Sequence, residues 1–425
     1  MKVLLSFLGT SKYQKCSYYF ENKENIVKGV KYIQEAMVEL FLKKFENFKV
    51  YIFITDEAKK KNWDNKLEKI LITKYGEEKI KPVKIPSINS EAEIWELFDI
   101  VYSSIPEKSE VIIDITHAFR SIPMLAVILI NYAKILKNIK VNGIYYGAIE
   151  ILGPFSEIEK IPEEKRIAPI INLTSFLKLM EWTEASFEFS RYGISKKLKD
   201  LTMAEVIPRL KKSKGKDENA KKLNFIANQL DNFTKCITTV RGKDLLFSIN
   251  YSQIKSYLED VKTTLKIKPL KPLVNIILDK IDNFNNNDIL NFIPAVEFCI
   301  KHNLIQQAIT ILLEGVITYF CEKFQFDYID ISKRNLISQV MNIKTKNIPE
   351  NKWEEPANKN IEITKQLLKK VDKEIANIFC KLQDMRNDIN HAGFKPNSRK
   401  VETFEKKLKD FFEKIKEEIS ICEKS

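Results

Sequence analysis

Apolar residues in the first third of the chain come in short runs that alternate with amphipathic stretches. Compact β-rich runs predict strands, and apolar residues at three- and four-residue steps predict helices. Strands are expected at 2–9, 49–55, 80–85, 111–116 and 141–149, and helices at 24–45, 59–75, 90–103 and 121–136. Strands that alternate with helices favour a parallel sheet covered on both faces. The pattern therefore predicts an α/β, Rossmann-like N-terminal domain.

From residue 173 onward the pattern changes to long helical stretches rich in Lys and Glu, with few strand signals. Two polar breaks, at 211–222 and 282–288, interrupt these stretches. Later helices are expected at 303–320, 374–392 and 401–422, with a polar loop at 347–360. We therefore expect three domains, namely an α/β domain at 1–172, an all-α connector at 173–285 and an all-α domain at 286–425.

The amino-acid composition bears on which kinds of partner the protein can bind. The chain has 425 residues, of which 44% are hydrophobic and 30% charged, so it can bury sizeable cores and is not expected to be disordered. Its formal net charge is +13. A basic excess favours polyanionic partners through counterion release, but lysines on solvated helix faces give the same total. The charge alone leaves both interpretations open.

The cysteine spacing and the apolar runs indicate the cellular compartment and argue against metal clusters and membrane spans. The six cysteines lie far apart without any CxxC pair, which argues against a metal cluster and against a disulfide framework. The first residues lack a long apolar region followed by a cleavage site, and the apolar run at 122–136 is interrupted by Asn131 and Lys134. We expect a cytoplasmic protein without metal, cofactor or membrane span.

The segment 381–394, KLQDMRNDINHAGF, carries the first candidate chemistry. Its apolar residues fall on one helical stripe, formed by Ile375, Ile378, Phe379, Leu382, Met385 and Ile389. The opposite side carries Arg386, Asn387, Asn390 and His391, and Asn387 lies one turn before His391. Gly393 is a natural helix C-cap, which places His391 in the last turn, where the helix dipole favours a protonated imidazole.

These residue types suit cleavage of RNA by its own 2′-hydroxyl. A histidine can transfer the proton near neutral pH, and an arginine can stabilise the charge that develops on phosphorus. We expect Arg386, Asn387 and His391 to be catalytic, with Asn387 orienting the other two. A solvated polar helix end would show the same spacing, and the spacing alone favours that simpler interpretation.

A second candidate site lies after two predicted strands, where an open parallel sheet binds ligands. The residues expected to contact a ligand are Gly9, Thr10, Ser11, Thr116, His117, Ala118 and Arg120. Helix N-termini there offer N–H groups to phosphates, Arg120 adds a cation and His117 adds a donor. Simpler roles are a turn at Gly9, an N-cap at Thr116 and a surface ion pair at Arg120. No G-x-G-x-x-G occurs, so a dinucleotide cofactor is not expected.

The segments MKVLLSFLGTSKYQKCSYYF and VIIDITHAFRSIPML resemble the CARF domain of CRISPR-associated proteins from type III systems. That family typically has FLGT-G-x-Y and D-x-THGFRS-x-P, and here Ser11 and Ala118 stand at two of its glycines. The segment IAPIINLTSF at 167–176 is also similar to the family.

The end of the chain resembles a different domain. RNDINHAG resembles the R-x4-6-H signature of HEPN ribonucleases, including the Asn after the Arg. The apolar stretch at 302–315 is similar to the helix that precedes the motif in such domains. Glu314 in this stretch is interpreted as a surface residue rather than as a support for the site.

The resemblance implies a specific activity. CARF domains of this family dimerise and bind cyclic oligoadenylate, for which we expect the tetra-adenylate, and binding activates a HEPN dimer that cuts single-stranded RNA and leaves a 2′,3′-cyclic phosphate. A ring of phosphates is symmetric and fits a two-fold dimer, so a homodimer or a higher even oligomer is expected.

Two other functions stay open on the sequence. A CARF domain can belong to a ligand-responsive transcriptional regulator, which would carry a helix-turn-helix with a basic recognition helix. It can also degrade the cyclic messenger as a ring nuclease, with help from His117 or Thr116.

Overall fold

The computed structural model describes residues 1–117, 122–264, 270–394 and 396–424. The chain divides into two compact units, Met1–Met180 and Glu181–Ser425. Helix α7 (Ser175–Tyr192) begins in the first unit and ends in the second.

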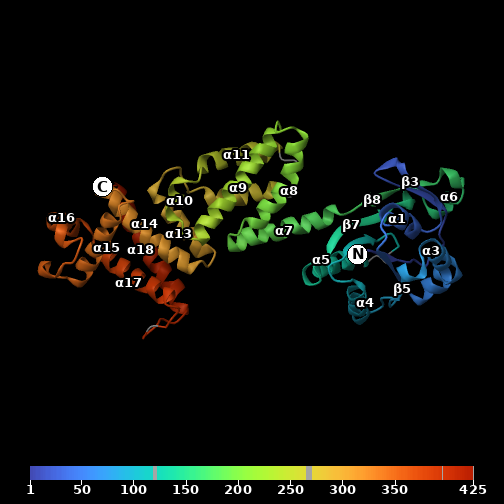
Figure 1. Ribbon diagram of the computed structural model, residues 1–425, viewed down its shortest axis with the longest axis horizontal. Coiled ribbons are helices and arrows are strands. Elements are labelled where there is room, and N and C mark those ends of the chain that lie inside the picture. Colours follow the sequence, from blue (N-terminus) through green and yellow to red (C-terminus); the bar gives the residue numbers. More distant parts are fainter. Residues whose placement is uncertain (118–121, 265–269, 395, 425) are drawn as a thin grey trace. The chain divides into compact units, whose positions relative to one another are not determined.

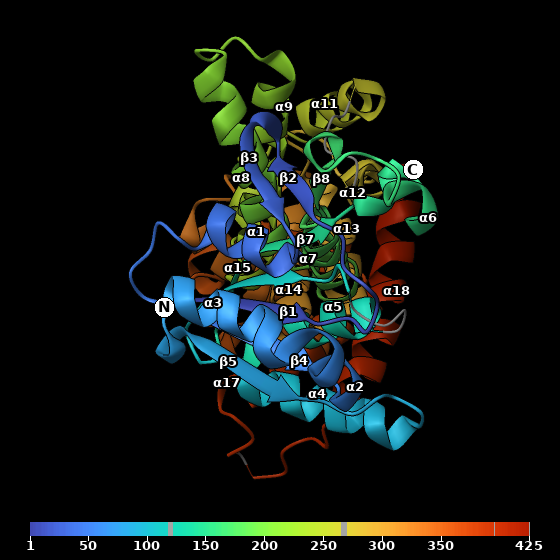
Figure 2. The same ribbon diagram turned by 90° about the vertical axis from the view of Figure 1, so that its right-hand side faces the viewer.

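The first unit is built on one eight-stranded sheet. Its strands are β1 (Lys2–Phe7), β2 (Cys16–Phe20), β3 (Asn22–Val30), β4 (Phe48–Ile54), β5 (Ile80–Lys84), β6 (Glu110–Asp114), β7 (Lys140–Gly147) and β8 (Ile167–Asn172). Their order across the sheet is β3-β2-β8-β7-β6-β1-β4-β5, which Figure 2 shows from β3 at the top to β5 at the bottom.

Five neighbouring strands, from β7 through β6, β1 and β4 to β5, are parallel. These are the five strands that the hydrophobic pattern predicts, so the Rossmann-like sheet is confirmed. Beyond β7 the sheet continues with β8 antiparallel, β2 parallel to β8, and β3 antiparallel to β2. The sheet is therefore mostly parallel, with a mixed edge.

Helices cover both faces of this sheet because the strand residues alternate between two apolar cores. Leu4 packs in the core beneath α1 (Ile33–Phe41) and α3 (Glu68–Tyr75). The next residue, Leu5, packs in the opposite core beneath α4 (Glu91–Ser104) and α5 (Ile122–Leu136). Figure 1 shows the two pairs of helices on opposite sides of the sheet.

The helix expected at 24–45 is wrong over its first part. Strand β3 occupies Asn22–Val30, and α1 begins only at Ile33. β3 is an edge strand, most of its side chains are exposed, and its scattered apolar residues imitate a helical pattern. The helix expected at 59–75 is also interrupted, because Asp64 and Asn65 have non-helical backbone angles inside the π-helical segment Lys59–Leu67, which precedes α3.

Shorter helical segments complete the first unit. They are α2 (Asp56–Ala58), α6 (Phe155–Ile158) and 3-10 turns at Glu77–Lys79, Ile149–Leu152 and Glu163–Lys165.

The second unit is helical throughout the part that the structure describes. Its helices are α8 (Lys196–Lys212), α9 (Glu218–Thr238), α10 (Gly242–Phe247), α11 (Tyr251–Thr264), α12 (Lys271–Ile281), α13 (Phe292–Lys301), α14 (Ile305–Lys323), α15 (Ile331–Lys346), α16 (Ile361–Lys370), α17 (Lys373–Asn390) and α18 (Glu402–Lys424). Short 3-10 turns lie at Ile289–Asn291, Glu350–Lys352 and Asn358–Asn360.

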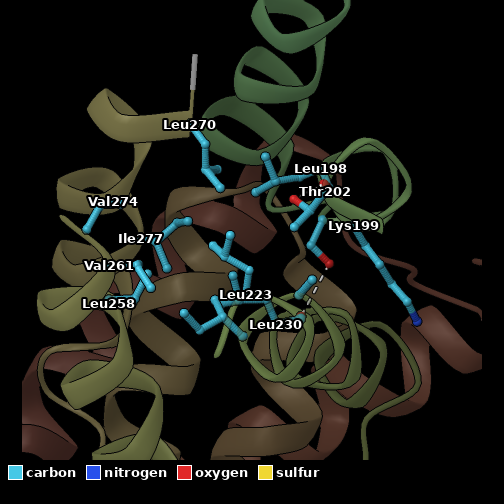
Figure 3. Close-up of a pocket in the computed structure, with 13 residues that line it drawn as sticks. Leu198, Lys199, Thr202, Leu223, Leu230, Leu258, Val261, Leu270, Val274 and Ile277 are labelled. Carbon is cyan, nitrogen blue, oxygen red and sulfur yellow. Dashed lines mark hydrogen bonds between the residues drawn. The ribbon is translucent and has the colours of Figure 1, made fainter. Parts of the chain in front are cut away.

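One apolar core extends through this unit, from Trp182 on α7 to Ile419 on α18. It crosses the boundary expected near residue 285, and the division into a connector and a last domain stays a prediction. Figure 3 shows an interior cavity between α8, α9, α11 and α12, with a volume of about 20 Å³, enough for a single water molecule. Among the described helices, none is long and apolar enough to cross a membrane.

Candidate functional sites

Two loops meet at one edge of the sheet in the first unit. Gly9 follows β1 and His117 lies shortly after β6, and these strands are neighbours in the sheet. A Cβ atom built on Gly9 would lie 3.2 Å from the Cβ of His117 and 3.3 Å from the hydroxyl oxygen of Tyr13. Gly9 therefore allows a close approach of the two loops, which a larger residue would push apart.

The loop after β1 is held in place by hydrogen bonds between side chains and its main-chain groups. The Gly9 N–H donates to the hydroxyl of Tyr13 at 2.8 Å. The amide Nδ2 of Asn62 donates to the carbonyl oxygens of Gly9 and Ser11, both at 2.9 Å. Burial raises the pKa of Tyr13, so its hydroxyl stays protonated. Thr10 lies between these fixed points and is partly exposed.

The end of β6 is fixed by a buried carboxyl group. Asp114 accepts hydrogen bonds from Ser6 Oγ at 2.6 Å, from the Thr116 N–H at 3.0 Å and from Thr116 Oγ1 at 2.5 Å. Thr116 Oγ1 in turn accepts from the Gly147 N–H at 2.8 Å. Burial raises the pKa of Asp114, and these hydrogen bonds oppose the shift. The Thr116 hydroxyl thus braces β6 against β7.

His117 packs its ring edge-on against Tyr13, with ring centroids 4.4 Å apart. Burial lowers the pKa of His117 to about 4, so the imidazole is neutral at neutral pH. It can donate a hydrogen bond to a ligand but does not supply a positive charge. Ala118 and Arg120, the other expected ligand residues, lie outside the described residues.

The sequence interpretation missed the residues that hold these loops. Asn62 lies in the π-helical segment, more than fifty positions from Gly9, and no local pattern marks it. Tyr13 occupies the Tyr position of the FLGT-G-x-Y pattern, so the resemblance contained a signal for it.

The motif helix α17 forms as the apolar stripe predicts. Asp372 is its N-cap and accepts hydrogen bonds from the Glu374 and Ile375 N–H groups at 2.6 and 3.1 Å. The stripe is buried at Ile375, Ile378, Phe379, Leu382 and Met385, and partly buried at Ile389. Figure 1 shows α14, α15, α17 and α18 gathered in one part of the second unit.

The end of α17 presents His391 to solvent. His391 is the C-cap residue, and its N–H donates to the carbonyl oxygen of Asn387 at 3.0 Å. Ala392 and Gly393 follow with φ of 51° and 73°, and the Gly393 N–H donates to the carbonyl oxygen of Asp388 at 3.2 Å. This left-handed cap stops the helix and leaves the imidazole exposed.

Arg386 is held by a carboxylate from another helix. Its Nη1 lies 3.5 Å from Oε1 of Glu314 on α14, and the other carboxylate oxygen, Oε2, lies 2.6 Å from Nη2 of Arg334 on α15. Glu314 therefore bridges two arginines. Its side chain is partly exposed, as expected of a surface residue, and it also pairs with both arginines, which the sequence did not indicate.

Arg334 is a rigid member of this cluster that the sequence interpretation did not single out. It donates to Thr318 Oγ1 and to the carbonyl oxygen of Tyr328, both at 3.0 Å. It also donates to the main-chain carbonyl of Glu314 at 3.2 Å. Arg334 comes from a separate helix, so only the tertiary structure brings it to Arg386.

Two further polar contacts shape the exposed end of α17. Asn390 Oδ1 accepts from Gln306 Nε2 on α14 at 3.3 Å. Asp388, in the middle of the motif, is buried and accepts from the Arg399 N–H at 2.8 Å. The Arg399 guanidinium lies 3.5 Å from the same carboxylate, which ties the following loop back to the helix.

In the part of the chain that the structure describes, no group of three or more His, Cys, Asp or Glu side chains is placed to hold a metal ion.

The doubly wound sheet, with two loops meeting beyond the ends of neighbouring parallel strands, defines an α/β ligand-binding domain of the Rossmann type. Comparison with known proteins identifies its family. Residues 3–150 match the family described as the CARF domain of the CRISPR system endoribonuclease Csx1. The first unit thus contains a CARF domain of the Csx1 type, which confirms the resemblance in this region.

The chain is also 30% identical over 279 residues to the CRISPR-associated protein MJ1674 of Methanocaldococcus jannaschii. The match covers 64% of this chain and 36% of that protein, so the chain spans about a third of the length of the curated relative. This likeness extends beyond the CARF domain and supports a relation to CRISPR-associated proteins.

Proposed function

We propose that this protein is a metal-independent endoribonuclease that cuts single-stranded RNA when its CARF domain binds cyclic oligoadenylate. The observation that carries the proposal is the arrangement at the end of α17, where an exposed His391 lies one turn and a half beyond an Arg386 positioned by Glu314. The match to the CARF domain of an endoribonuclease supports it. The last domain, at 286–425, is then a HEPN domain.

The residues suit cleavage by internal attack. Attack of the 2′-oxygen on phosphorus removes a proton from that oxygen and returns one to the leaving 5′-oxygen, which leaves a 2′,3′-cyclic phosphate. His391 is a suitable proton donor or acceptor, and the Arg386 guanidinium stabilises the extra negative charge on the phosphoryl oxygens. Asn387, half-buried one turn before His391, orients the reacting groups.

This chemistry favours a dimer. One His391 can be base or acid in a given turnover, whereas the reaction uses both, and two copies of the exposed helix end would supply a pair. The first unit also offers a surface for a second copy. Large apolar side chains exposed on α4 and α5 are Ile94, Trp95, Ile128, Tyr132, Ile135 and Leu136. An apolar patch of this kind is typical of a protein interface, and two-fold pairing would offer both sets of loops to a symmetric ring.

The strand-end loops are proposed to bind the activator through Gly9, Thr10, Ser11, Thr116, His117, Ala118 and Arg120. A neutral His117 and fixed main-chain groups suit hydrogen bonding to a nucleotide. Two observations weigh against a ring nuclease. With its lowered pKa, His117 is a weak base and stays uncharged at neutral pH, and the Thr116 hydroxyl is engaged with Asp114.

The test is cleavage of end-labelled single-stranded RNA by the full chain in EDTA, with and without cyclic tetra-adenylate. We expect cleavage only with activator, and products that end in a 2′,3′-cyclic phosphate. Consumption of the cyclic oligoadenylate with intact RNA would instead identify a ring nuclease. If neither molecule is cut, the ligand-responsive transcriptional regulator is the favoured function.

A further inference from the structure

A cavity of about 290 Å³ opens in the second unit beside the arginine cluster. It lies between α10, the N-terminal part of α13, the middle of α14 and the loop that leads to α15. Its volume is more than ten times that of the interior cavity in Figure 3, so it can receive a ligand group, whereas the other has room for no more than a water molecule. The residues that line the cavity determine which chemical group can bind in it.

One wall is a preformed flat aromatic surface. The rings of Phe247 and Tyr328 are stacked, with centroids 5.4 Å apart and planes inclined by 12°. Both residues are partly exposed and line the cavity. Behind them the floor is closed, because α14 packs tightly on Phe292 at Gly315, where an added Cβ would lie 2.3 Å from the ring.

The other wall is polar. It presents the Glu314 carboxylate, Thr318 and the Arg334 guanidinium, and the exposed Lys243 lies at the rim. An aromatic pair and a carboxylate in the lining of one cavity suit a planar heterocycle that carries amino donors. The cations at the rim and in the wall suit a phosphate linked to that heterocycle.

The position of the cavity connects it to the motif. Glu314 and Arg334 also line a second hollow, of about 310 Å³, which contains Arg386. The two hollows are thus separated by the Glu314–Arg334 ion pair, and a strand with a phosphate at Arg386 can place a neighbouring base in the aromatic cavity.

We propose that this cavity is a nucleobase subsite of the RNA substrate, in which a base next to the cut stacks on the Phe247–Tyr328 ring pair. This inference rests on the proposed ribonuclease function. Bases that present an amino group to Glu314, namely adenine, cytosine and guanine, bind there in preference to uracil. The base fixes which phosphate lies at Arg386, so the subsite sets where the strand is cut.

The test couples a change in the substrate to a change in the protein. The substrate is a DNA oligonucleotide with a single ribonucleotide as the cutting position, and the neighbouring nucleotide on each side is in turn replaced by an abasic one. In the wild type, with cyclic tetra-adenylate, one of the two abasic substrates should lose about tenfold in kcat/KM, the loss typical of one stacked base. In Phe247→Ala the same replacement should cost little, since the stacking partner is already gone.

Two controls keep this result specific. Phe247→Leu retains apolar volume but removes the ring, and should behave like Phe247→Ala. Phe225→Ala removes a ring from a different aromatic pair of the same unit, Phe225 with Tyr257 at 5.4 Å, and should keep the full loss with the abasic substrate. The melting temperature of each variant checks folding.

Equal losses with the abasic substrate in wild type and both Phe247 variants overturn the subsite while leaving the ribonuclease intact. Binding of the uncleavable all-deoxy oligonucleotide gives an answer that does not need cleavage. If RNA is never cut but this binding depends on the neighbouring base and on Phe247, the proposed function fails and the subsite stands. If Phe247→Ala converts a dimer to a monomer in sedimentation, the cavity receives a polypeptide segment and the assignment to a nucleobase is wrong.

Discussion

The strand-end loops of the first unit and the helix end of the second are built in opposite ways. In the loops, Asn62, Tyr13 and the buried Asp114 hold main-chain and side-chain groups in place before any ligand arrives. At the helix end, His391 is exposed and Arg386 is held by a single bridging carboxylate. The first construction is typical of recognition, where the geometry must already match the ligand.

The second construction suits chemistry that needs another copy of the chain. The imidazole of His391 is exposed and accessible to a substrate, whereas burial lowers the pKa of His117 to about 4 and keeps its imidazole uncharged near neutral pH. This difference between the two histidines is the reason we propose binding for one site and proton transfer for the other.

Among Arg386, Glu314 and His117, the largest effect is expected from the motif arginine. Arg386→Ala should lower the maximal rate of RNA cleavage by about 10²–10³-fold, because the developing phosphoryl charge loses its cation. Arg386→Lys should recover part of the rate, since it restores the charge but not the planar fork. Steady-state cleavage with saturating activator measures both. Lys381→Ala, an exposed change on the same helix, serves as the control and should cleave like the wild type.

A smaller effect is expected from the carboxylate that positions this arginine. Glu314→Gln should lower kcat by about tenfold with little change in KM, because Arg386 loses its alignment but stays available. Glu314→Asp should restore part of kcat. A purely structural role would instead lower the melting temperature and leave the kcat of the folded fraction unchanged.

The smallest effect concerns pH and the loop histidine. The folded chain keeps His117 neutral down to a pH of about 4, while the unfolded chain takes up a proton near its ordinary pKa of 6.5. Protons bound only by the unfolded state lower stability as the pH falls, so the contribution of neutral His117 is complete above pH 6.5 and is lost toward pH 4. His117→Gln should reduce the stability difference between pH 7 and pH 5 by about 1–2 kcal/mol.

Denaturant unfolding of wild type and variant at the two pH values measures this difference, and a comparison between pH values cancels any effect of the substitution itself. An identical pH dependence in both proteins would show that His117 is solvated and titrates normally, and the contrast with His391 would then disappear.

The two regions also differ in how far the sequence predicted them. The central strands β1 and β6 were predicted because both of their faces are buried and their apolar runs are continuous, as in residues 111–113 of β6. Strand β3 was missed because it is an exposed edge strand and carries no such run. The apolar stripe of α17 and its glycine-terminated end were predicted, since both are local properties of the chain.

The sequence could not predict contacts between residues from distant segments of the chain. Asn62 braces the loop at Gly9, and Arg334 shares Glu314 with Arg386, although each comes from a different element. Burial of Asp388 inside a polar motif was equally invisible, because it depends on Arg399 folding back onto the helix. These residues come together only in the tertiary structure, so their spacing along the chain does not reveal the contacts.

The division of roles is tested most directly by measuring activator affinity and maximal RNA cleavage on the same preparations of Asn62→Ala and His391→Ala. Asn62→Ala should weaken binding of cyclic tetra-adenylate by about tenfold and reach nearly the wild-type rate at saturation, because only the loop is disturbed. His391→Ala should bind the activator like the wild type and lose about 10²–10⁴-fold in rate. A His391→Ala protein that folds, binds activator and cuts RNA at the wild-type rate would contradict the account.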